Sequence, residues 1–380
     1  MNTLEYQICT RCIMDTTDPD IVFDADGVCN HCLEYDQKVP KFWKPGAEGR
    51  KEIDAIFEGI KAEQKDKEYD AVIGLSGGVD SSYLAYIAVK VFKLRLLAVH
   101  VDGGWNSELA VKNIENIVNT LGIDLYTEVI DWEEMRDLQV SFLNAAVANQ
   151  DVPQDHAFFA ALYRTAIQHK IRHVLSGGNY ATESIMPFEW AYNAMDLTHL
   201  KSIHKRFGKL KLKSYPTVNF FDYYFRFPYI NRMTVIRPLN YWPYNKEEAI
   251  RTLEQEVGFR YYGGKHFESR FTKWQQLQYR PMKFGYDERR AYLSSLILSG
   301  QMDRGVAIAE LAGYTYSDFQ QKEDADYVRK KLNLSEAEFK AILDLPAKTF
   351  RDYPSEYWML KLKDKFKHFM GRFGINFKGK

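Results

Sequence analysis

Between residues 69 and 176, short apolar runs alternate with longer segments whose apolar residues recur at helical spacing. The apolar runs predict β-strands, because each is too short for an ordinary helix, and they cover Tyr69–Leu75, Leu94–Val101, Leu125–Ile130 and His173–Ser176. The intervening segments predict helices at Ser82–Val91, Glu108–Leu121, Trp132–Asn149 and Ala157–Lys170. Strands that alternate with helices indicate an α/β fold with a doubly wound parallel sheet. The ligand site of such a sheet lies at the carboxyl ends of its strands.

The pattern differs on both sides of this alternation. Residues 40–49 contain paired prolines and glycines, which is typical of a linker, and Lys51–Gln64 predicts an amphipathic helix. After about residue 182 the alternation is lost. Residues 286–350 predict a mostly helical region, with a capping box of Ser335 and Glu338 before its last helix. We therefore expect a cysteine module at 1–40, a nucleotide-binding domain at 50–240 and a helical C-terminal region at 241–380 that completes the site.

Composition and charge exclude several classes of protein. The 380 residues include 51 basic and 51 acidic side chains, so the net charge at pH 7 is zero and charge-driven binding to nucleic acid is not expected. No apolar run approaches the roughly 18 residues of a membrane helix, and the first ten residues lack the apolar core of a signal peptide. We therefore expect a cytoplasmic protein with no membrane partner. Aromatic residues make up 15% of the chain, which indicates a large aromatic-walled surface or cleft.

Four cysteines, Cys9, Cys12, Cys29 and Cys32, form the pattern C-x2-C-x16-C-x2-C. Two residues between cysteines allow a tight turn to direct both sulfurs at one ion, and four thiolates complete a tetrahedral zinc site. Two disulfides are one alternative, which an intracellular chain disfavours, and an iron–sulfur cluster is another. We expect a structural Zn²⁺ that stabilises folding and leaves no open position for substrate. Asp24–Gly27 is expected to form the turn between the cysteine pairs.

The chain has no cysteine after Cys32. A thiol is therefore not available in the rest of the chain as a nucleophile or a sulfur carrier. Residue 2 is Asn2, so an N-terminal cysteine that hydrolyses glutamine is not expected. We expect neither glutamine hydrolysis nor thiol-based sulfur transfer from this chain.

The first predicted strand leads directly into Ser76-Gly77-Gly78-Val79-Asp80-Ser81-Ser82, which a predicted helix follows. Glycines let the backbone approach phosphate closely, and hydroxyls and the amides of a helix N-terminus donate hydrogen bonds to it. The segment is neither a Walker loop nor a G-x-G-x-x-G fingerprint. We interpret it as a polyphosphate-binding loop in which Asp80 binds Mg²⁺. An ordinary glycine-containing turn is the alternative.

This loop resembles the S-G-G-x-D-S signature of the PP-loop ATP pyrophosphatases, which have a doubly wound domain of the adenine-nucleotide alpha-hydrolase type. Members of that superfamily adenylate a carbonyl oxygen with ATP, release pyrophosphate, and displace AMP with a nitrogen or sulfur nucleophile. The resemblance implies that the loop binds pyrophosphate through Ser76, Gly77, Gly78, Val79, Asp80, Ser81 and Ser82. By position, it also implies that the ends of two other strands contact the nucleotide through His100, Asp102, Gly177, Gly178 and Asn179.

Nearly the full chain resembles the N-acetyl sugar amidotransferase family of bacterial surface-polysaccharide (lipopolysaccharide O-antigen) and nonulosonic-acid pathways. The matching stretches are Cys9–Cys32, Gly74–Ser82, His100–Trp105, Arg237–Tyr241, Gly263–Thr272, Tyr286–Arg290 and Leu296–Gln301. The resemblance implies an enzyme that uses ATP and Mg²⁺ to convert the acetamido group of an N-acetyl sugar, free or nucleotide-linked, into an acetamidino group. It also implies that ammonia comes from a partner glutaminase of the histidine-biosynthesis type with a matching cyclase-type subunit.

Lys265, His266, Glu268 and Arg270 place four charged or titratable side chains within six residues, directly after two glycines. This grouping suits phosphate contact and proton transfer, and a solvated loop with internal ion pairs is the alternative. With the resemblance, we expect Lys265, His266 and Glu268 to be catalytic together with Asp80. Arg270 is expected to bind ATP or pyrophosphate.

Other segments have more than one interpretation. Asp155 and His156 are expected to cap a helix with an exposed imidazole, and a catalytic pair is the alternative. The basic segment 201–213 suits a phosphate-bearing ligand, a partner subunit or a solvated loop. The aromatic segment 219–229 is expected in a core or an interface rather than in a sugar platform. Residues 361–378, where basic and Phe residues intermingle, predict an amphipathic capping helix, and contact with nucleic acid or a membrane surface is the alternative.

Two other functions fit parts of the sequence. A tRNA-modifying adenylase of the PP-loop superfamily would share the ATP loop and the zinc module. The missing core cysteines and the neutral net charge argue against it, and nucleic acid is not the expected substrate. A non-catalytic zinc adaptor would not need the complete phosphate loop. The sequence therefore favours an ATP-dependent amidotransferase.

Overall fold

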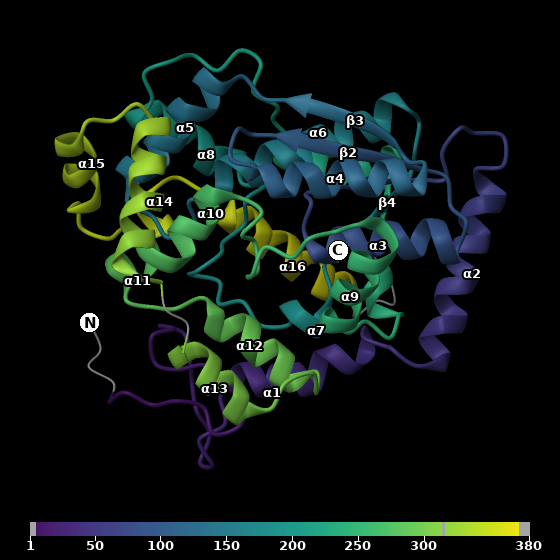
Figure 1. Ribbon diagram of the computed structural model, residues 1–380, viewed down its shortest axis with the longest axis horizontal. Helices are drawn as coiled ribbons and strands as arrows, with labels where there is room; N and C mark the ends of the chain where they lie inside the picture. The colour runs from purple at the N-terminus through teal and green to yellow at the C-terminus, as the bar shows by residue number, and fades with distance from the viewer. Residues whose placement is uncertain (1–4, 314–315, 372–380) are drawn as a thin grey trace.

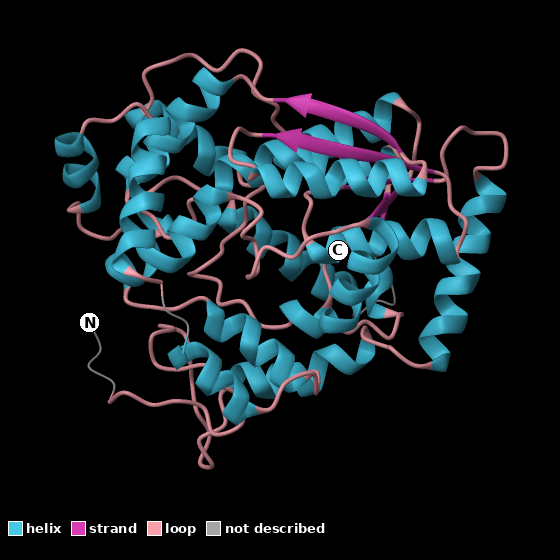
Figure 2. Cartoon of the chain, in the orientation of Figure 1, coloured by secondary structure: helices cyan, strands magenta, loops and turns pink. Residues whose placement is uncertain are grey.

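The sheet of the molecule consists of five parallel strands. Figures 1 and 2 show part of this sheet among the surrounding helices. The computed structural model describes residues 5–313 and 316–371, with side chains described to residue 365. The strands are β1 (Ala71–Gly74), β2 (Leu96–Asp102), β3 (Asp124–Val129), β4 (His173–Leu175) and β5 (Thr234–Ile236), in the order β3-β2-β1-β4-β5. The predicted parallel α/β sheet is thus confirmed. The three-residue strand β5 is an addition to the predicted ones.

Helices cover both faces of the sheet, as the doubly wound prediction requires. Those of the first two thirds of the chain are α1 (Asn30–Lys38), α2 (Ala47–Glu63), α3 (Val79–Tyr86), α4 (Glu108–Leu121), α5 (Trp132–Ala145), α6 (Val152–Gln168), α7 (Tyr180–Glu183), α8 (Leu197–Phe207) and α9 (Lys246–Val257). The predicted linker at 40–49 is partly helical, since α2 starts inside it. A π-helical turn, Ile87–Val91, extends α3.

Successive residues of a strand point to opposite faces of a sheet, and the two cores follow this rule. Val72 and Val99 pack with apolar side chains of α5, α6 and α8 on one face. Ile73 and Ala98 pack with α2, α3, α4 and α9 on the other. Burial on both faces explains why the inner strands are continuous apolar runs rather than alternating ones.

The C-terminal region is mostly helical, as predicted. Its helices are α10 (Arg270–Trp274), α11 (Arg280–Phe284), α12 (Arg289–Leu298), α13 (Arg304–Gly313), α14 (Asp318–Lys331), α15 (Glu336–Leu343) and α16 (Tyr357–Gly371). The predicted capping box is present, because Ser335 accepts from the amide of Glu338 while the Glu338 carboxylate accepts from the amide of Ser335. The predicted amphipathic tail coincides with α16 as far as Gly371, and its remainder lies outside the described residues.

Two segments with open interpretations are helical in part. The basic segment 201–213 begins in α8, and its backbone is held by carboxylates of α5: Glu134 accepts from the amide of Lys213 at 2.7 Å, and Asp137 accepts from that of Lys209 at 3.0 Å. The aromatic segment overlaps a π-helix, Asp222–Ile230, in which Phe227 is buried, and Phe221 just before this helix is exposed. No helix among the described residues is long and apolar enough to cross a bilayer.

The order of the strands identifies where a ligand binds. β1 is followed by β2 on one side, whereas β4 and β5 lie on its other side. The switch in direction leaves a crevice at the carboxyl ends of β1 and β4, which is the usual ligand site of open α/β sheets. The S-G-G-x-D-S loop follows β1, and the glycine-containing segment Ser176–Asn179 follows β4. Both lie at this crevice.

Candidate active site and cysteine cluster

The loop between β1 and α3 depends on its two glycines. Gly77 has φ +80°, and a Cβ there would lie 2.7 Å from the carbonyl oxygen of Ala110. Gly78 precedes the first residue of α3, and a Cβ there would lie 3.1 Å from Ser76 Oγ. The hydroxyl of Ser76 accepts from the amide of Gly78 at 3.2 Å. The loop therefore places the N-terminus of α3, whose first amides have no partner within the helix, at the floor of the crevice.

A cavity of about 390 Å³ lies against this loop. Its walls include three cationic side chains that suit a polyphosphate, Arg237, Lys246 and Lys265. Gly177 packs directly on the loop, since a Cβ at this position would lie 3.1 Å from the backbone nitrogen of Ser81. Of the residues predicted to bind the nucleotide, the cavity is lined by Ser76, Gly78, Val79, Asp80, Ser81, Gly177 and Gly178.

Two carboxylates at this cavity form the best candidate for a magnesium site. Asp80, in the first turn of α3, accepts a hydrogen bond from the hydroxyl of Tyr244. Burial raises the pKa of Asp80, the positive charge of Lys265 opposes this, and the negative charge of Glu183 adds to it. Lys265 Nζ lies 2.9 Å from Glu183 Oε1. A cation between the carboxylates would relieve their repulsion, so the oxygen donors of Asp80 and Glu183 fit Mg²⁺.

His266 and Glu268 form an ion pair at the rim of the same cavity. His266 has φ +63°, which a non-glycine residue rarely adopts, and its Nδ1 lies 3.6 Å from Glu268 Oε1. Burial lowers the pKa of His266, but the Glu268 carboxylate outweighs burial and the net pKa is raised. Glu268 Oε2 is buried without a hydrogen-bond partner among the described residues. The pair therefore leaves a carboxylate oxygen that can accept a hydrogen bond from a ligand, and it lies where the backbone is strained, as at many functional sites.

A second cavity, of about 280 Å³, adjoins the first. Ser76, Asp155, Phe158, His266 and Glu268 line both cavities. The remaining walls are rich in amide and carboxylate side chains, including Asn149, Asp151, Gln154, Gln276 and Glu288. Such groups suit the hydroxyls of a sugar. The two cavities can therefore bring a nucleotide and a second polar molecule together beside Glu268.

Several predicted residues hold the site together from outside the nucleotide cavity. His100 lines the second cavity, and its ring contacts the carbonyl of Leu75 at 3.0 Å through Nδ1. Asp102 accepts from the amide of Gly104 at 2.8 Å and so closes the turn after β2. Asn179 caps α7 by accepting from the amide of Thr182. The predicted loop residues Gly77 and Ser82 are buried and shape the loop.

The structure does not bring Arg270 to the nucleotide cavity. Its guanidinium contacts Asp324 at 2.9 Å and stacks on Tyr327 at 3.9 Å from the ring centroid. Both partners lie on α14, more than 50 residues later in the chain. They bind the guanidinium that was expected to contact phosphate. Arg270 lines a different cavity, beside α14.

The expectation for Asp155 and His156 is also corrected. Asp151, not Asp155, precedes α6, and Asp155 lies in its first turn. The imidazole of His156 is fully buried: Nδ1 contacts the carbonyl oxygen of Ala194 at 2.9 Å, and Nε2 accepts from the amide of Val218 at 3.1 Å. His156 is thus a structural residue, whereas Asp155 faces both cavities.

Sequence reasoning did not find several residues of the nucleotide cavity. Glu183, Lys246 and Tyr262 line the cavity, and Tyr244 contacts Asp80 beside it. All four lie outside the motifs that the sequence shows. Arg237 lies in one of the stretches that carry the family resemblance, and this resemblance was the one indication in the sequence that Arg237 belongs to the site. Lys246 opens α9, but a lysine at the start of a helix has no pattern that distinguishes it from a surface residue.

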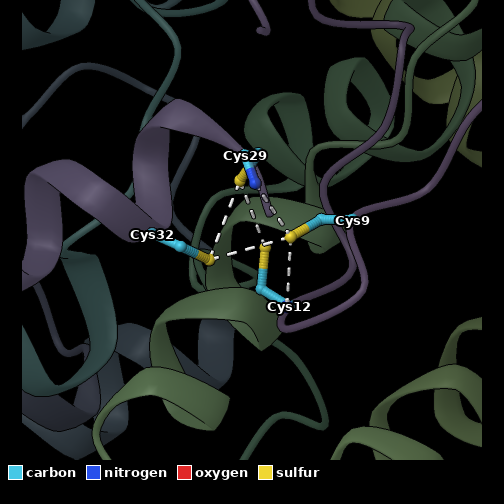
Figure 3. A group of neighbouring side chains, drawn as sticks. All are labelled: Cys9, Cys12, Cys29 and Cys32. Atoms are coloured by element: carbon cyan, nitrogen blue, oxygen red, sulfur yellow. Dashed lines mark hydrogen bonds between the residues drawn. The ribbon is translucent and has the colours of Figure 1, made fainter. Parts of the chain in front are cut away.

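The four cysteines gather into one buried cluster, as predicted (Figure 3). Their sulfurs lie 3.7 Å apart for Cys12–Cys29 and for Cys29–Cys32, and 3.8 Å apart for Cys9–Cys32. A tetrahedral ion at about 2.3 Å from each sulfur requires separations of about 3.8 Å, so the cluster fits Zn²⁺. These distances also exclude disulfides. The expected turn is present, because the amide of Gly27 donates to the carbonyl oxygen of Asp24.

The cysteine module is attached to the C-terminal region and, through it, to the site. Arg304 donates to the carbonyl oxygens of Cys12 and Cys9, at 2.9 and 2.8 Å. Arg290, on α12, lies 2.9 Å from the carboxylate of Asp15. Helix α12 also packs on α7, and the hydroxyl of Ser295 accepts from the amide of Ile185, two residues after α7 ends. Since α7 ends at Glu183, the module supports a wall of the nucleotide cavity.

Comparison with known proteins identifies two regions of the chain. Residues 52–215 match the family "NAD synthase", and residues 268–367 match "LPS biosynthesis protein WbpG-like, C-terminal domain". A curated relative, the glutamine-hydrolysing GMP synthase of Aeropyrum pernix, is 25% identical over 221 residues, which are 58% of this chain. The matched region is 36% of the relative, so the chain spans about a third of its length.

Solved structures with partial likeness include two synthetases. The NH3-dependent NAD synthetase of Campylobacter jejuni, in complex with a nitrate ion, has a TM-score of 0.29 at 14% identity and covers 42% of this chain and 72% of its own. The NMN synthetase of Francisella tularensis has a TM-score of 0.32 at 15% identity and covers 81% of this chain and 95% of its own.

The parallel sheet, the S-G-G-x-D-S loop and the NAD-synthase match are those of the PP-loop superfamily, and the curated relative named above is an amidating synthetase. The match to a WbpG-like C-terminal domain adds a second, more specific likeness. An NAD-synthase-like domain followed by a WbpG-like domain is consistent with an N-acetyl sugar amidotransferase of the PP-loop superfamily.

Proposed function

We propose that this chain is an ATP-dependent amidotransferase that converts the acetamido group of an N-acetyl sugar into an acetamidino group. The observation that supports the proposal most directly is the pair of adjoining cavities with the shared residues Ser76, His266 and Glu268. The WbpG-like domain supports a role in lipopolysaccharide or related surface-polysaccharide synthesis. We place the reaction in the cytoplasm, where ATP is available.

In the proposed reaction, the amide oxygen of the sugar attacks the α-phosphorus of ATP and pyrophosphate leaves. Ammonia then adds to the activated carbon and AMP leaves. The amides of the loop and the hydroxyls of Ser76 and Ser81 would hold the pyrophosphate. Asp80 and Glu183 would hold Mg²⁺, which neutralises phosphate charge when bound. The segment from Tyr262 to Glu268 would exclude water from the activated amide.

The nitrogen is proposed to come from another protein. All four cysteines of the chain lie in the cysteine cluster, and none lines either cavity. We therefore propose that ammonia is delivered by a glutaminase of the histidine-biosynthesis type with a cyclase-type subunit, the partners that the family resemblance implies. The N-acetyl sugar substrate is free or nucleotide-linked.

The test measures AMP formation from ATP together with the mass of the sugar product, in which NH replaces O. Ammonium chloride should support slow turnover by the isolated chain at neutral to mildly alkaline pH, and glutamine should not. Adding the glutaminase–cyclase pair should allow glutamine to be used. Glutamine hydrolysis by the isolated chain would contradict the proposal on nitrogen. AMP formation that requires tRNA would replace the proposal with a tRNA-modifying adenylase.

A further inference from the structure

The carboxylate of Asp155 differs from the other carboxylates of the two cavities. Each of the others has a protein partner: for example, Asp151 accepts from the hydroxyl of Thr272 at 3.0 Å, and Glu288 pairs with Arg280. Among the described residues, the Asp155 carboxylate has no hydrogen bond or ion pair, and it lines both cavities. A carboxylate that faces ligand space without a protein partner is available to a ligand.

The position of Asp155 is fixed by packing. It lies in the first turn of α6, one turn before Phe158, whose ring sits against β1. A Cβ at Gly74 would lie 2.6 Å from Phe158 Cζ, so only a glycine in β1 lets the ring approach this closely. This contact holds the first turn of α6 beside the phosphate loop. Asp155 therefore stands at the border between the nucleotide and the second molecule.

Among the described residues, the lysine and unpaired arginine side chains lie in the nucleotide cavity and not in the second one. The nucleotide cavity has Arg237, Lys246 and Lys265, whereas the second cavity has no lysine, and its one arginine, Arg280, is already paired with a glutamate. The second cavity is thus negative overall. It suits a cation such as ammonium better than a phosphate.

We propose that Asp155 is the catalytic base that accepts a proton from ammonium at the border of the two cavities. This role rests on the proposed function. An N–C bond forms from the deprotonated nitrogen to the activated carbon, and the C–O bond to AMP breaks with its electron pair on AMP. The nitrogen loses two protons between ammonium and the amidinium product. Asp155 accepts the first, and the phosphate of the departing AMP accepts the second.

The surroundings of Asp155 are compatible with this role. Asp155 is exposed to solvent at the cavity surface, but enclosure by the cavity walls, and then the negative charge of Asp151, raise its pKa to about 7, against the positive charges of His266 and Arg280. The other titratable or charged groups of the second cavity are those of His100, Glu268, Glu288 and Tyr292. The nucleotide cavity adds those of Asp80, Tyr163, Glu183, Tyr223, Arg237, Lys246, Tyr261, Tyr262 and Lys265. A base with a pKa near neutrality is half ionised there and still a strong enough acceptor.

The test compares two nucleophiles in the Asp155→Asn variant. Ammonium at neutral pH must lose a proton before it attacks, whereas hydroxylamine is already neutral. We expect AMP-coupled product formation with ammonium to fall about a hundredfold or more, while the rate with hydroxylamine stays close to wild type. Asp155→Glu should restore part of the ammonium rate. An equal loss with both nucleophiles would show a merely structural role, and wild-type rates with ammonium would overturn the proposal.

The pH profile gives a second readout. At constant total ammonium, the wild-type rate should level off above about pH 7, whereas the Asp155→Asn rate should continue to rise as free ammonia increases. A third measurement does not depend on the sugar. Calorimetry with acetamidinium chloride, in the presence of AMP, should show binding that Asp155→Asn weakens and Asp155→Glu retains. Undiminished binding to Asp155→Asn would contradict the placement of the cation, whereas absent turnover in the wild type would count against the proposed function alone.

Discussion

The backbone amide of Val79 donates a hydrogen bond to the hydroxyl oxygen of Tyr262 over 3.2 Å. Val79 is the first residue of α3, so its amide is one of those that a helix N-terminus offers to a phosphate. Tyr262 precedes Gly263, whose φ is +85°. The hydroxyl of Tyr262 and a phosphate oxygen therefore compete for the same donor.

Tyr262→Phe removes this competitor and keeps the ring that packs on Phe259. We expect pyrophosphate to bind about fivefold more tightly, which corresponds to the net free energy of one hydrogen bond. Calorimetry with pyrophosphate and Mg²⁺ measures the change. Tyr261→Phe is the matched control, because the hydroxyl of Tyr261 makes no hydrogen bond to the loop within the described residues. Weaker binding to Tyr262→Phe would mean that the hydroxyl contacts the ligand instead.

Asp80→Asn should lower the activity of the protein without lowering its stability. Loss of the carboxylate should lower AMP formation about a hundredfold or more, because the phosphates lose the bound cation that offsets their charge. The pKa of Asp80 is raised by burial, so the folded state disfavours its ionised form at neutral pH and the neutral amide should not lower the thermal midpoint. Tyr244→Phe, which removes the hydrogen bond to Asp80 and keeps the charge, is the control. AMP formation by Asp80→Asn at the wild-type rate would exclude Asp80 as a metal ligand.

Purified protein should contain about one zinc ion per chain. Cys9→Ser should lose the metal and lower the thermal midpoint, and it should affect catalysis through the support that α12 gives to α7. Metal analysis and thermal unfolding measure both effects. Arg304→Ala, which removes the hydrogen bonds to the carbonyls of Cys9 and Cys12, should keep the metal and lower the midpoint less. A metal-free protein with an unchanged midpoint would contradict this prediction.

Stability should fall as the solution becomes acidic, because His156 is buried in its neutral form. Burial lowers its pKa to about 4, from 6.5 in the unfolded chain, so the unfolded state binds more protons between these values. Stability is therefore fully present above pH 6.5 and is lost as pH falls toward 4, with a cost of about 2 kcal/mol at pH 5. Urea unfolding at pH 7 and pH 5 tests this. His156→Gln should flatten the pH dependence, whereas His169→Gln, at an exposed position, should not; equal slopes in all three proteins would contradict the assignment.

The elements of the sheet could be predicted because each pattern there is long enough to show its period. Helix α4 matches the predicted bounds, Glu108–Leu121, since its apolar residues recur at helical spacing and Gly122 ends it in the left-handed conformation. Strand β5 has only three residues, of which none is fully buried, so no pattern distinguishes it from a loop. The local pattern thus predicted β1 to β4 and did not indicate β5.

The site could be predicted only where a motif or a spacing carries the chemistry. The cysteines and the S-G-G-x-D-S loop are local patterns, and the cysteines cluster as expected. Glu183 and Tyr244 reach the loop because the strand order brings their segments together, which no short motif encodes. For Arg270 the local sequence was misleading. Its neighbours in the chain suit phosphate binding, but its guanidinium donates instead to the carboxylate of Asp324, 54 positions later.

The contacts that hold the cysteine module have a consequence for the order of events during synthesis. Cys9 and Arg304 are 295 positions apart, and Ile13 and Ser294 are 281 apart. At about 5–20 residues per second, roughly 15 to 60 s separate the emergence of Cys9 from that of its arginine. The four thiols can capture an ion early, but the face that docks on α12 and α13 must wait for the last quarter of the chain. A ribosome that stalls before residue 304 would therefore present a metal-loaded module with its docking face open to solvent and to other proteins.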